Sequence, residues 1–305
     1  MPADRKQGMD HPHHAWSPIS ARRQLVWPNG ARVALVVIVT LEHMEWEPPT
    51  GSYTSPILAG GSGRRPYPDY GRLTIREYGH RVGVFRLLEV LRRNGVTPTI
   101  AIDALTAEHY PALVGHCQRA GAEFLAHGVS VSRMITSRMT EQEERNYIES
   151  ATQTITAATG ARPTGWFGPE HGESERTPAL LAEAGFNYVC DWVNDEQPYA
   201  MSTPSGNLTA LPIMLELDDV HAMSGRKVPF ARWGRMVTEA FEMLYVDGAN
   251  NGRLLVLNLH PWLVGQPFRI RALDSALATV MARDGVWATT GAEVAAWYRD
   301  HGPSR

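Results

Sequence analysis

Acidic, imidazole and indole side chains follow apolar runs of the sequence at the points where those runs end. The residues concerned are Glu42-His43, Asp103, His127-Gly128, Gly168-Pro169-Glu170, Asp191-Trp192 and His260-Pro261-Trp262. A carboxylate that faces an imidazole can supply a general base and a general acid. Such a pair can activate water for attack on a carbonyl carbon, and this is the chemistry that these residue types favour.

Other chemistries lack their usual signatures. The sequence contains no Gly-x-Ser-x-Gly nucleophile elbow, no Gly-x-Gly-x-x-Gly turn and no Walker loop. Its two cysteines are Cys117 and Cys190, and Cys190 falls inside a predicted strand, where a buried small apolar residue is commoner than a nucleophile. The sequence therefore gives little support to acyl-enzyme formation, nicotinamide binding or nucleotide hydrolysis.

The apolar runs that carry these residues predict the strands of a parallel sheet. The run Arg32–Leu41 is continuous and rich in β-branched residues, as in a strand buried on both faces. Shorter runs predict strands at Thr97–Asp103, Glu123–His127, Thr164–Gly168, Asn187–Asp191, Leu208–Met214, Arg253–His260 and Val286–Thr289. Helical patterns lie between them, at Glu77–Asn94, Tyr110–Ala120, Thr140–Thr159, Thr177–Ala184, Ala231–Val246, Ile270–Ala282 and Ala292–Asp300. The alternation predicts an α/β fold, a closed or nearly closed barrel of seven or eight βαβ units.

Parallel barrels form their active sites at the carboxyl ends of their strands. We therefore expect Glu42, His127 and His260 to lie at that end, with Asp191 or Asp195 orienting an imidazole or binding a substrate N–H. Aromatic side chains often wall small-molecule pockets, and three tryptophans are expected to do so here: Trp166, Trp192 and Trp262.

Charge and composition exclude several partners. The 305-residue chain carries 29 Lys and Arg against 32 Asp and Glu, a net charge of −3, which gives no electrostatic footprint for nucleic acid. No apolar run reaches the roughly 18 residues that span a bilayer, and neither a signal peptide nor a disulfide framework is indicated, so we expect a cytoplasmic protein. Residues 1–27 are expected to form an N-terminal arm and residues 28–305 a single barrel domain. The Pro- and Gly-rich segment Glu47–Tyr70 is expected to be a loop that covers the site.

Five motifs together resemble the polysaccharide deacetylase superfamily, in the branch near cofactor-independent allantoinases and cyclic imide hydrolases. They are Arg32–Glu47, Ala126–Gly128, Gly165–Glu170, Tyr188–Asp195 and Leu259–Phe268, and the last, with the spacing His-Pro-x-x-x-Gly-Gln-Pro, is the most specific. The resemblance runs from about Pro28 to Tyr298. It implies an irregular (β/α) barrel of seven or eight units, a hydrolase of non-peptide C–N bonds, and a homo-oligomer.

The sequence departs from the metal site of this family. Its metal-dependent members bind a divalent ion through an aspartate after the first strand and a His-x-x-x-His pair after the third. Here Glu42-His43 replaces the tandem aspartates, and Gly-Val-Ser-Val131 follows His127, so the second histidine is missing. The arginine of the fourth-strand motif is also absent, and Trp166-Phe167-Gly168 stands there instead. The resemblance therefore favours a site without a cofactor, and the alternative is a rebuilt zinc site of Glu42, His43 and His127.

The favoured function is hydrolysis of a C–N bond in a small cyclic amide, imide or ureide. Glu42 or His127 would activate water as the base, and His260 would act as the acid or position the carbonyl, with Asp191 in support. The expected substrate-binding residues are His43, Trp166, Pro169, Glu170, Trp192, Asp195 and Trp262. Two alternatives remain open: a metal-dependent deacetylase of N-acetylated carbohydrates, and a non-catalytic barrel that binds a small ligand.

Overall fold

Strand β1 is an interior strand of the sheet, because other strands pair with both of its edges. The computed structural model describes residues 11–52, 68–206 and 208–302. Within these residues β1 (Val33–Leu41) pairs in parallel with β8 (Arg253–Leu259) on one edge. On the other edge it pairs with β9 (Val286–Thr289) and then with β2 (Pro98–Ile102). The parallel register brings the carboxyl ends of β1, β2 and β8 to the same end of the sheet.

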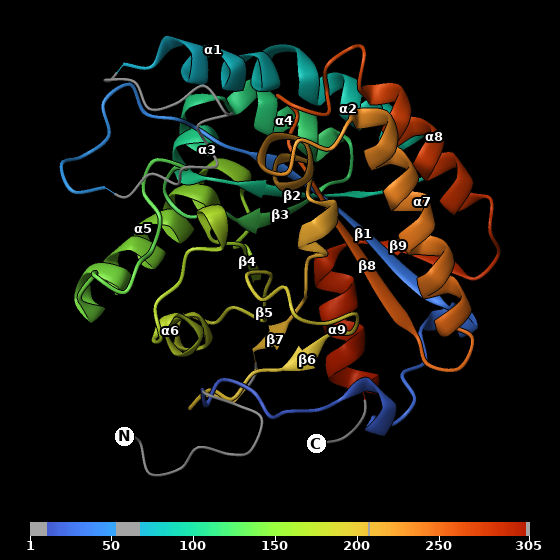
Figure 1. Ribbon diagram of the computed structural model, residues 1–305. Helices are drawn as coiled ribbons and strands as arrows, with labels where there is room; N and C mark the ends of the chain where they lie inside the picture. Colours follow the sequence, from blue (N-terminus) through green and yellow to red (C-terminus); the bar gives the residue numbers. More distant parts are fainter. Residues whose placement is uncertain (1–10, 53–67, 207, 303–305) are drawn as a thin grey trace.

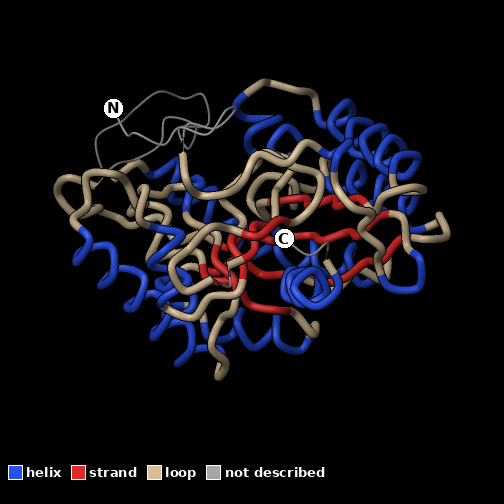
Figure 2. Tube along the Cα trace, turned by 90° about the horizontal axis from the view of Figure 1, so that it is seen from below, coloured by secondary structure: helices blue, strands red, loops and turns tan. Residues whose placement is uncertain are grey.

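The sheet continues from β2 through strands that become very short. The remaining strands are β3 (Glu123–Ala126), β4 (Gly165–Trp166), β5 (Tyr188–Val189), β6 (Tyr199–Ala200) and β7 (Thr209–Ala210). The order is β6-β7-β5-β4-β3-β2-β1-β8, and every described pairing is parallel except that of β6 with β7. The strands lie at the centre with helices around them (Figures 1 and 2). This curled sheet is the irregular α/β barrel in a single domain that the sequence predicts.

The helices fall close to the predicted segments. Their bounds are α1 (Tyr70–Tyr78), α2 (Val84–Arg93), α3 (Ala104–His109), α4 (Pro111–Arg119), α5 (Glu141–Thr159), α6 (Thr177–Glu183), α7 (Phe230–Asp247), α8 (Ile270–Met281) and α9 (Gly291–His301). The capping box of Thr140 and Glu143 opens α5 as expected. An additional short helix, α3, precedes the predicted segment 110–120, because the Asp103 side chain accepts the N–H of Thr106 and caps it.

The helical segment predicted from Glu77 is longer and is interrupted by a π-turn. It begins at Tyr70, and residues Gly79–Gly83 form one π-helical stretch between α1 and α2. A Cβ at Gly83 would overlap the carbonyl oxygen of Pro261, and one at Gly79 would lie 2.9 Å from the backbone nitrogen of Trp262. The two glycines therefore let this stretch pack backbone to backbone against the loop after β8. The π-turn brings the last turn of α1 to the carboxyl end of the sheet, which matters for the site.

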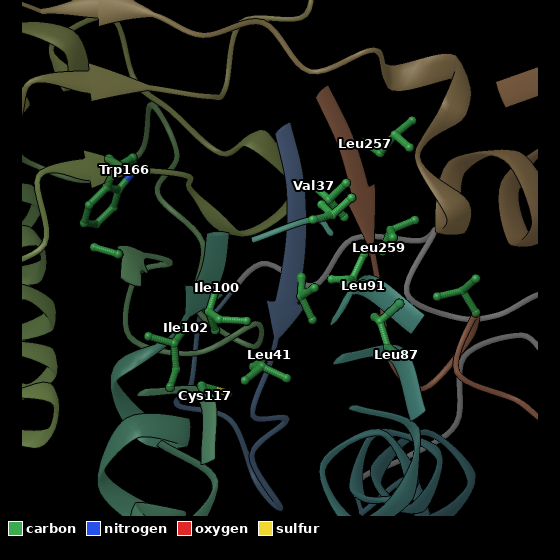
Figure 3. Packing of buried hydrophobic residues seen from close by; sticks show 14 of the residues in the cluster. Val37, Leu41, Leu87, Leu91, Ile100, Ile102, Cys117, Trp166, Leu257 and Leu259 are labelled. Atoms are coloured by element: carbon green, nitrogen blue, oxygen red, sulfur yellow. The ribbon is translucent and has the colours of Figure 1, made fainter. Parts of the chain in front are cut away.

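Apolar side chains fill both faces of the sheet. All nine residues of β1 are buried, as predicted for a strand covered on both sides. Val37 and Leu41 contribute to the main cluster, together with Leu257 of β8 and Leu87 of α2 (Figure 3). Burial of this apolar surface, at about 25 cal/mol per Å², is the main term that stabilises the sheet.

The end of the N-terminal segment packs on the barrel. Leu25 and Trp27 are only 2% and 1% exposed and belong to a second apolar cluster. The indole N–H of Trp27 donates to the carbonyl of Arg253, and Asn251 accepts the N–H of Leu25. Among the described residues, no helix is long and apolar enough to cross a membrane.

Candidate active site

Glu42 is the first residue after β1, and it lies between two histidines and an arginine. Its side chain is 3% exposed. Oε1 lies 3.5 Å from Nε2 of His127 and 3.8 Å from Nε2 of His260, and Oε2 lies 3.5 Å from Nε of Arg76. Burial alone would raise the pKa of this carboxyl, but the neighbouring His127, His260 and Arg76 outweigh it and lower the pKa to about 2. Glu42 is therefore a carboxylate at neutral pH.

His127 follows β3 and is held in one orientation. Its Nδ1 lies 2.6 Å from the carbonyl oxygen of Phe167, which can only accept a hydrogen bond, so Nδ1 carries a proton. In the neutral ring, Nε2 is then the acceptor. This atom faces Glu42 and has no hydrogen-bond partner among the described residues. Gly128 turns the chain away at φ +67, and a Cβ there would overlap the hydroxyl of Tyr147.

His260 follows β8 and is paired with a buried carboxylate, Asp219. Its Nδ1 lies 2.7 Å from Oδ1 of Asp219, and its backbone N–H donates to both oxygens of the same carboxylate. Burial lowers the pKa of the imidazole, but the charge and hydrogen bond of Asp219 outweigh that effect and raise the pKa to about 10. His260 is therefore an imidazolium at neutral pH, with Nε2–H directed toward Glu42.

A chain of hydrogen bonds fixes the segment that carries Asp219. The hydroxyl of Thr40 on β1 lies 2.5 Å from the amide oxygen of Asn258 on β8. The amide nitrogen of Asn258 donates to Asp218 at 2.6 Å, and Asp218 also accepts the N–H of His221. The chain thus runs from β1 through Asn258 of β8 to residues 218–221. It holds the segment whose Asp219 carboxylate pairs with His260.

A second acidic pair lies beside the site. Asp191 follows β5, and its Oδ1 accepts the backbone N–H of Gly168 at 2.8 Å. Its other oxygen is buried beside Glu173. Burial and the Glu173 carboxyl together raise the pKa of Asp191 well above its usual range, while burial raises the pKa of Glu173 to about 7. At neutral pH this pair holds at least one proton.

The carboxylate that orients an imidazole is Asp219, which corrects the expectation for Asp191 and Asp195. Asp191 contacts Gly168 and Glu173, whereas Asp195 accepts from Arg22 at 2.7 Å and caps the N–H groups of Glu196 and Gln197. Asp195 therefore anchors the N-terminal segment. It lines a cavity of about 1030 Å³ between residues 11–23 and 194–202, whose lining includes none of the Glu42 cluster.

The three tryptophans predicted to wall the pocket lie in three different parts of the structure. Trp262 lies beside His260, with ring centroids 6.0 Å apart, and faces the guanidinium of Arg76. Trp166 is fully buried and packs on Phe186 and Tyr147 in the main core (Figure 3), so it is not a pocket wall. Trp192 is half-buried, and the imidazoles of three N-terminal residues surround it: His11, His13 and His14.

The fourth-strand motif forms a tight turn. Pro169 is buried, and Glu170 and His171 both have positive φ values of 55 and 57. His171 is thereby placed with its ring 4.9 Å from that of Phe167, and burial lowers its pKa to about 4. Strained backbone of this kind is concentrated at functional sites. Residues 53–67 of the predicted covering loop lie outside the described residues.

The alternative metal set of Glu42, His43 and His127 does not converge. The His43 ring packs against His109 and Tyr110, because neighbouring side chains along an extended chain point to opposite sides. Among the described residues the side chains close enough to share an ion are Asp218, Asp219 and His260. Their ligand atoms already have partners. Asp219 is hydrogen-bonded to His260, and Asp218 accepts from Asn258 and from the backbone N–H of residue 221. The residues present therefore do not fit the metal site of the family.

Asp219 and Arg76 belong to this cluster but are not among the residues that the sequence predicts for the site. The adjacent acids Asp218 and Asp219 come shortly after the predicted strand Leu208–Met214, so the strand-end rule could have indicated Asp219. Arg76 has no such signal, since it lies on a helix that contacts the site only through the π-turn.

The chain is similar in sequence and fold to several known proteins. Residues 76–189 match the family model described as polysaccharide deacetylase. A Schizosaccharomyces pombe protein whose name refers to polysaccharide deacetylase is 25% identical over 301 residues, covering 90% of this chain and 93% of that protein. The solved structure of PuuE allantoinase is 27% identical, with a TM-score of 0.81 over 91% of this chain and 94% of its own. A structure from Pseudomonas aeruginosa PAO1, also named for polysaccharide deacetylase, is 27% identical, with a TM-score of 0.80 over 91% and 95%. These comparisons show a polysaccharide deacetylase domain over residues 76–189, and a fold shared with the two solved structures along about nine tenths of the chain.

Proposed function

We propose that this protein hydrolyses a C–N bond in a small cyclic amide, imide or ureide without a metal ion. The observation that carries the proposal is the cluster of Glu42, His127 and His260, with Asp219 behind the last. It combines a carboxylate, an imidazole with an unpartnered acceptor nitrogen and an imidazolium within one buried site. These are the groups that activation of water and protonation of a leaving nitrogen require.

His127 is the better base of the two candidates. A carboxyl whose pKa is about 2 binds a proton poorly at neutral pH, so Glu42 is a weak proton acceptor. Nε2 of His127 and the Glu42 carboxylate are both acceptors that face the same space, and together they would orient a water molecule between carbonyl and imidazole. Glu42 would then stabilise the imidazolium that forms as His127 takes the proton.

His260 is the acid. The water oxygen forms a bond to the carbonyl carbon, and its proton passes to Nε2 of His127. The C–N bond then breaks, and Nε2–H of His260 protonates the leaving nitrogen. The product of ring opening is a carboxylic acid that carries the amide or ureido nitrogen. Asp219 keeps His260 protonated until this step.

Two observations support a small substrate. The reacting side chains are nearly enclosed, since Glu42 is 4% exposed and His260 and Trp262 are 7% and 9% exposed. A small planar ring suits such a site better than a polysaccharide chain does. The structural similarity to a protein named as an allantoinase, whose name refers to a cyclic ureide, points in the same direction.

The proposal is tested by incubating the purified protein with hydantoin, succinimide and allantoin and measuring ring opening. We expect turnover of at least one of them. His127→Gln and His260→Ala should each lower kcat by about 10²- to 10⁴-fold, the usual contribution of a positioned acid or base. His301→Gln is the matched control, because His301 is exposed at the end of α9. Release of acetate from N-acetylated sugars, with no ring opening, would instead support the deacetylase function.

A further inference from the structure

The guanidinium of Arg76 is buried without an adequate partner. The residue is 2% exposed, and none of its three side-chain nitrogens has a hydrogen-bond partner among the described residues. Its closest charged neighbour is Oε2 of Glu42, at 3.5 Å from Nε, which is too long for a hydrogen bond. Buried donors that lack acceptors are costly, so this arrangement indicates that an acceptor outside the described chain belongs there.

Contacts with Trp262 and the packing of the π-turn hold this guanidinium close to the reacting groups. Its Cζ lies 5.2 Å from the centre of the Trp262 ring, a distance at which the aromatic face attracts a cation. Gly79 and Gly83 allow the π-turn to lie directly on Pro261 and Trp262, which fixes the end of α1 against the loop that carries His260. The N–H groups of Arg76 are thus locked on one side of Glu42, while His127 and His260 lie on its other oxygen.

We propose that Arg76 binds the oxygen of the carbonyl group that is attacked and is a further catalytic residue of the reaction. This inference rests on the proposed function, because it assigns the electrophile of that reaction. As water adds, the carbonyl oxygen becomes an oxyanion, and after the C–N bond breaks it becomes part of a carboxylate. A guanidinium can hold all three states, and it holds the carboxylate in two parallel hydrogen bonds.

This role predicts the class of substrate and product. The ligand offers acceptor oxygens in one plane, as the carbonyl groups of an imide or cyclic ureide do, and its product is a ureido or amido carboxylate. The indole N–H of Trp262 is a further buried donor without a partner among the described residues, and it can donate a hydrogen bond to a second ring carbonyl. The site therefore favours rings with two carbonyl groups over simple lactams.

The test compares Arg76→Gln and Arg76→Lys with wild type, using hydantoin as substrate and N-carbamoylglycine as product probe. Loss of one donor to an oxyanion lowers kcat by about 10²- to 10³-fold, and we expect that loss for Arg76→Gln with a smaller change in KM. Arg76→Lys keeps the positive charge but lacks the two parallel N–H donors of the guanidinium, so its kcat should fall less than that of Arg76→Gln. Added guanidinium should restore part of the activity of Arg76→Ala. Titration calorimetry should detect N-carbamoylglycine binding to wild type and at least tenfold weaker binding to Arg76→Gln.

Arg81→Gln is the matched control, since Arg81 is exposed on the same helical stretch. Full turnover by a folded Arg76→Gln variant would overturn the assignment of Arg76 while leaving the hydrolysis itself intact. If Arg76→Gln does not fold, Arg76→Lys decides: wild-type kcat and undiminished binding of N-carbamoylglycine would contradict a bidentate contact. If no ring is opened by wild type, the proposed function fails, and weaker binding of the carboxylate probe to the Arg76 variants still identifies the site as a carboxylate receptor.

Discussion

The carboxylate of Asp219 accepts hydrogen bonds from two N–H groups of His260. The ring Nδ1 lies 2.7 Å from Oδ1, and the backbone nitrogen lies 3.1 Å from Oδ1 and 3.0 Å from Oδ2. This contact holds the imidazole in one rotamer and directs Nε2 at Glu42. It also provides the negative charge that raises the pKa of His260 to about 10 against the effect of burial. In the proposed reaction, Asp219 would therefore keep the acid His260 protonated from the Nδ1 side, opposite the Nε2–H that protonates the leaving nitrogen.

Asp219→Asn should move the alkaline limit of activity to lower pH. In wild type we expect kcat to fall as pH rises through about 10, where His260 loses its proton. Without the charge of Asp219 the burial of the imidazole dominates, so its pKa falls and the limit shifts downward by at least one pH unit, about 1.4 kcal/mol per unit. The measurement is a pH profile of kcat with the ring substrate.

The control for this change is Glu216→Gln, because Glu216 lies on the same segment with its side chain 63% exposed. Its pH profile should match wild type. An unchanged alkaline limit in a folded Asp219→Asn protein would show that Asp219 does not set the protonation of His260.

Glu42→Gln should destabilise the fold as well as reduce activity. The carboxylate lies between Arg76, His127 and His260, and its loss leaves the buried cations Arg76 and His260 without this counter-charge. Removing one partner of a buried ion pair costs about 3–5 kcal/mol, and urea unfolding at pH 7 measures it. Because the pKa of Glu42 is lowered to about 2, its stabilising effect is complete above the unfolded value of 4.5 and is lost as pH falls through 2. The difference between wild type and Glu42→Gln should therefore shrink on acidification, and a difference that stays constant from pH 7 to pH 2 would contradict the account.

The strands that end at the site could be predicted because their apolar runs are long or sharply bounded. Arg32–Leu41 and Arg253–His260 are such runs, so the positions of Glu42 and His260 followed from the strand-end rule. The rule says nothing about where a side chain points after the strand ends. His43 and Asp103 satisfy it and are instead a packing residue and a helix cap.

The rest of the site depends on contacts between segments that are distant in sequence. Arg76 reaches Glu42 because a π-turn places α1 against the loop after β8, and no local pattern encodes that packing. Trp166 has the same strand-end position as residues of the site, yet its indole fills the core beside Phe186. Whether such a side chain enters the core or the site depends on which face of the strand it lies on. A strand of two residues such as β4 is too short to show the alternation of apolar and polar residues that would reveal the face.

Gly83→Ala should lower both stability and activity, although Gly83 is not one of the reacting residues. A Cβ at this position would overlap the carbonyl of Pro261, so the π-turn and the loop after β8 would have to separate. Overpacking of this kind costs about 1–3 kcal/mol, and thermal unfolding should show it. Activity should fall as well, because Arg76 and Trp262 would move apart.

Gly71→Ala is the matched control for Gly83. It lies in the first turn of α1, the helix that runs into the π-turn, where a Cβ would meet only Asp69 at 3.7 Å. Alanine favours a helix over glycine by up to about 1 kcal/mol, so this variant should be as stable as wild type or slightly more stable. Equal melting temperatures for both variants would show that the contact of Gly83 with Pro261 is not restrictive.

Chelation should leave the activity unchanged. The described residues around Glu42 provide an arginine and two histidines that do not share an ion position with it, and His43 points elsewhere. We therefore expect the same kcat before and after dialysis against EDTA and 1,10-phenanthroline, and no gain on addition of zinc. Loss of activity that zinc alone restores would support the metal-dependent alternative.

The most direct test of the central claim is ring opening of hydantoin, succinimide and allantoin by protein whose metal content has been reduced to a small fraction of an equivalent and verified by elemental analysis. We expect at least one of these rings to be hydrolysed at the rate of untreated protein, and His127→Gln to lose this activity by about 10²-fold or more. Hydrolysis that requires stoichiometric zinc, or that persists at full rate in His127→Gln, would contradict it.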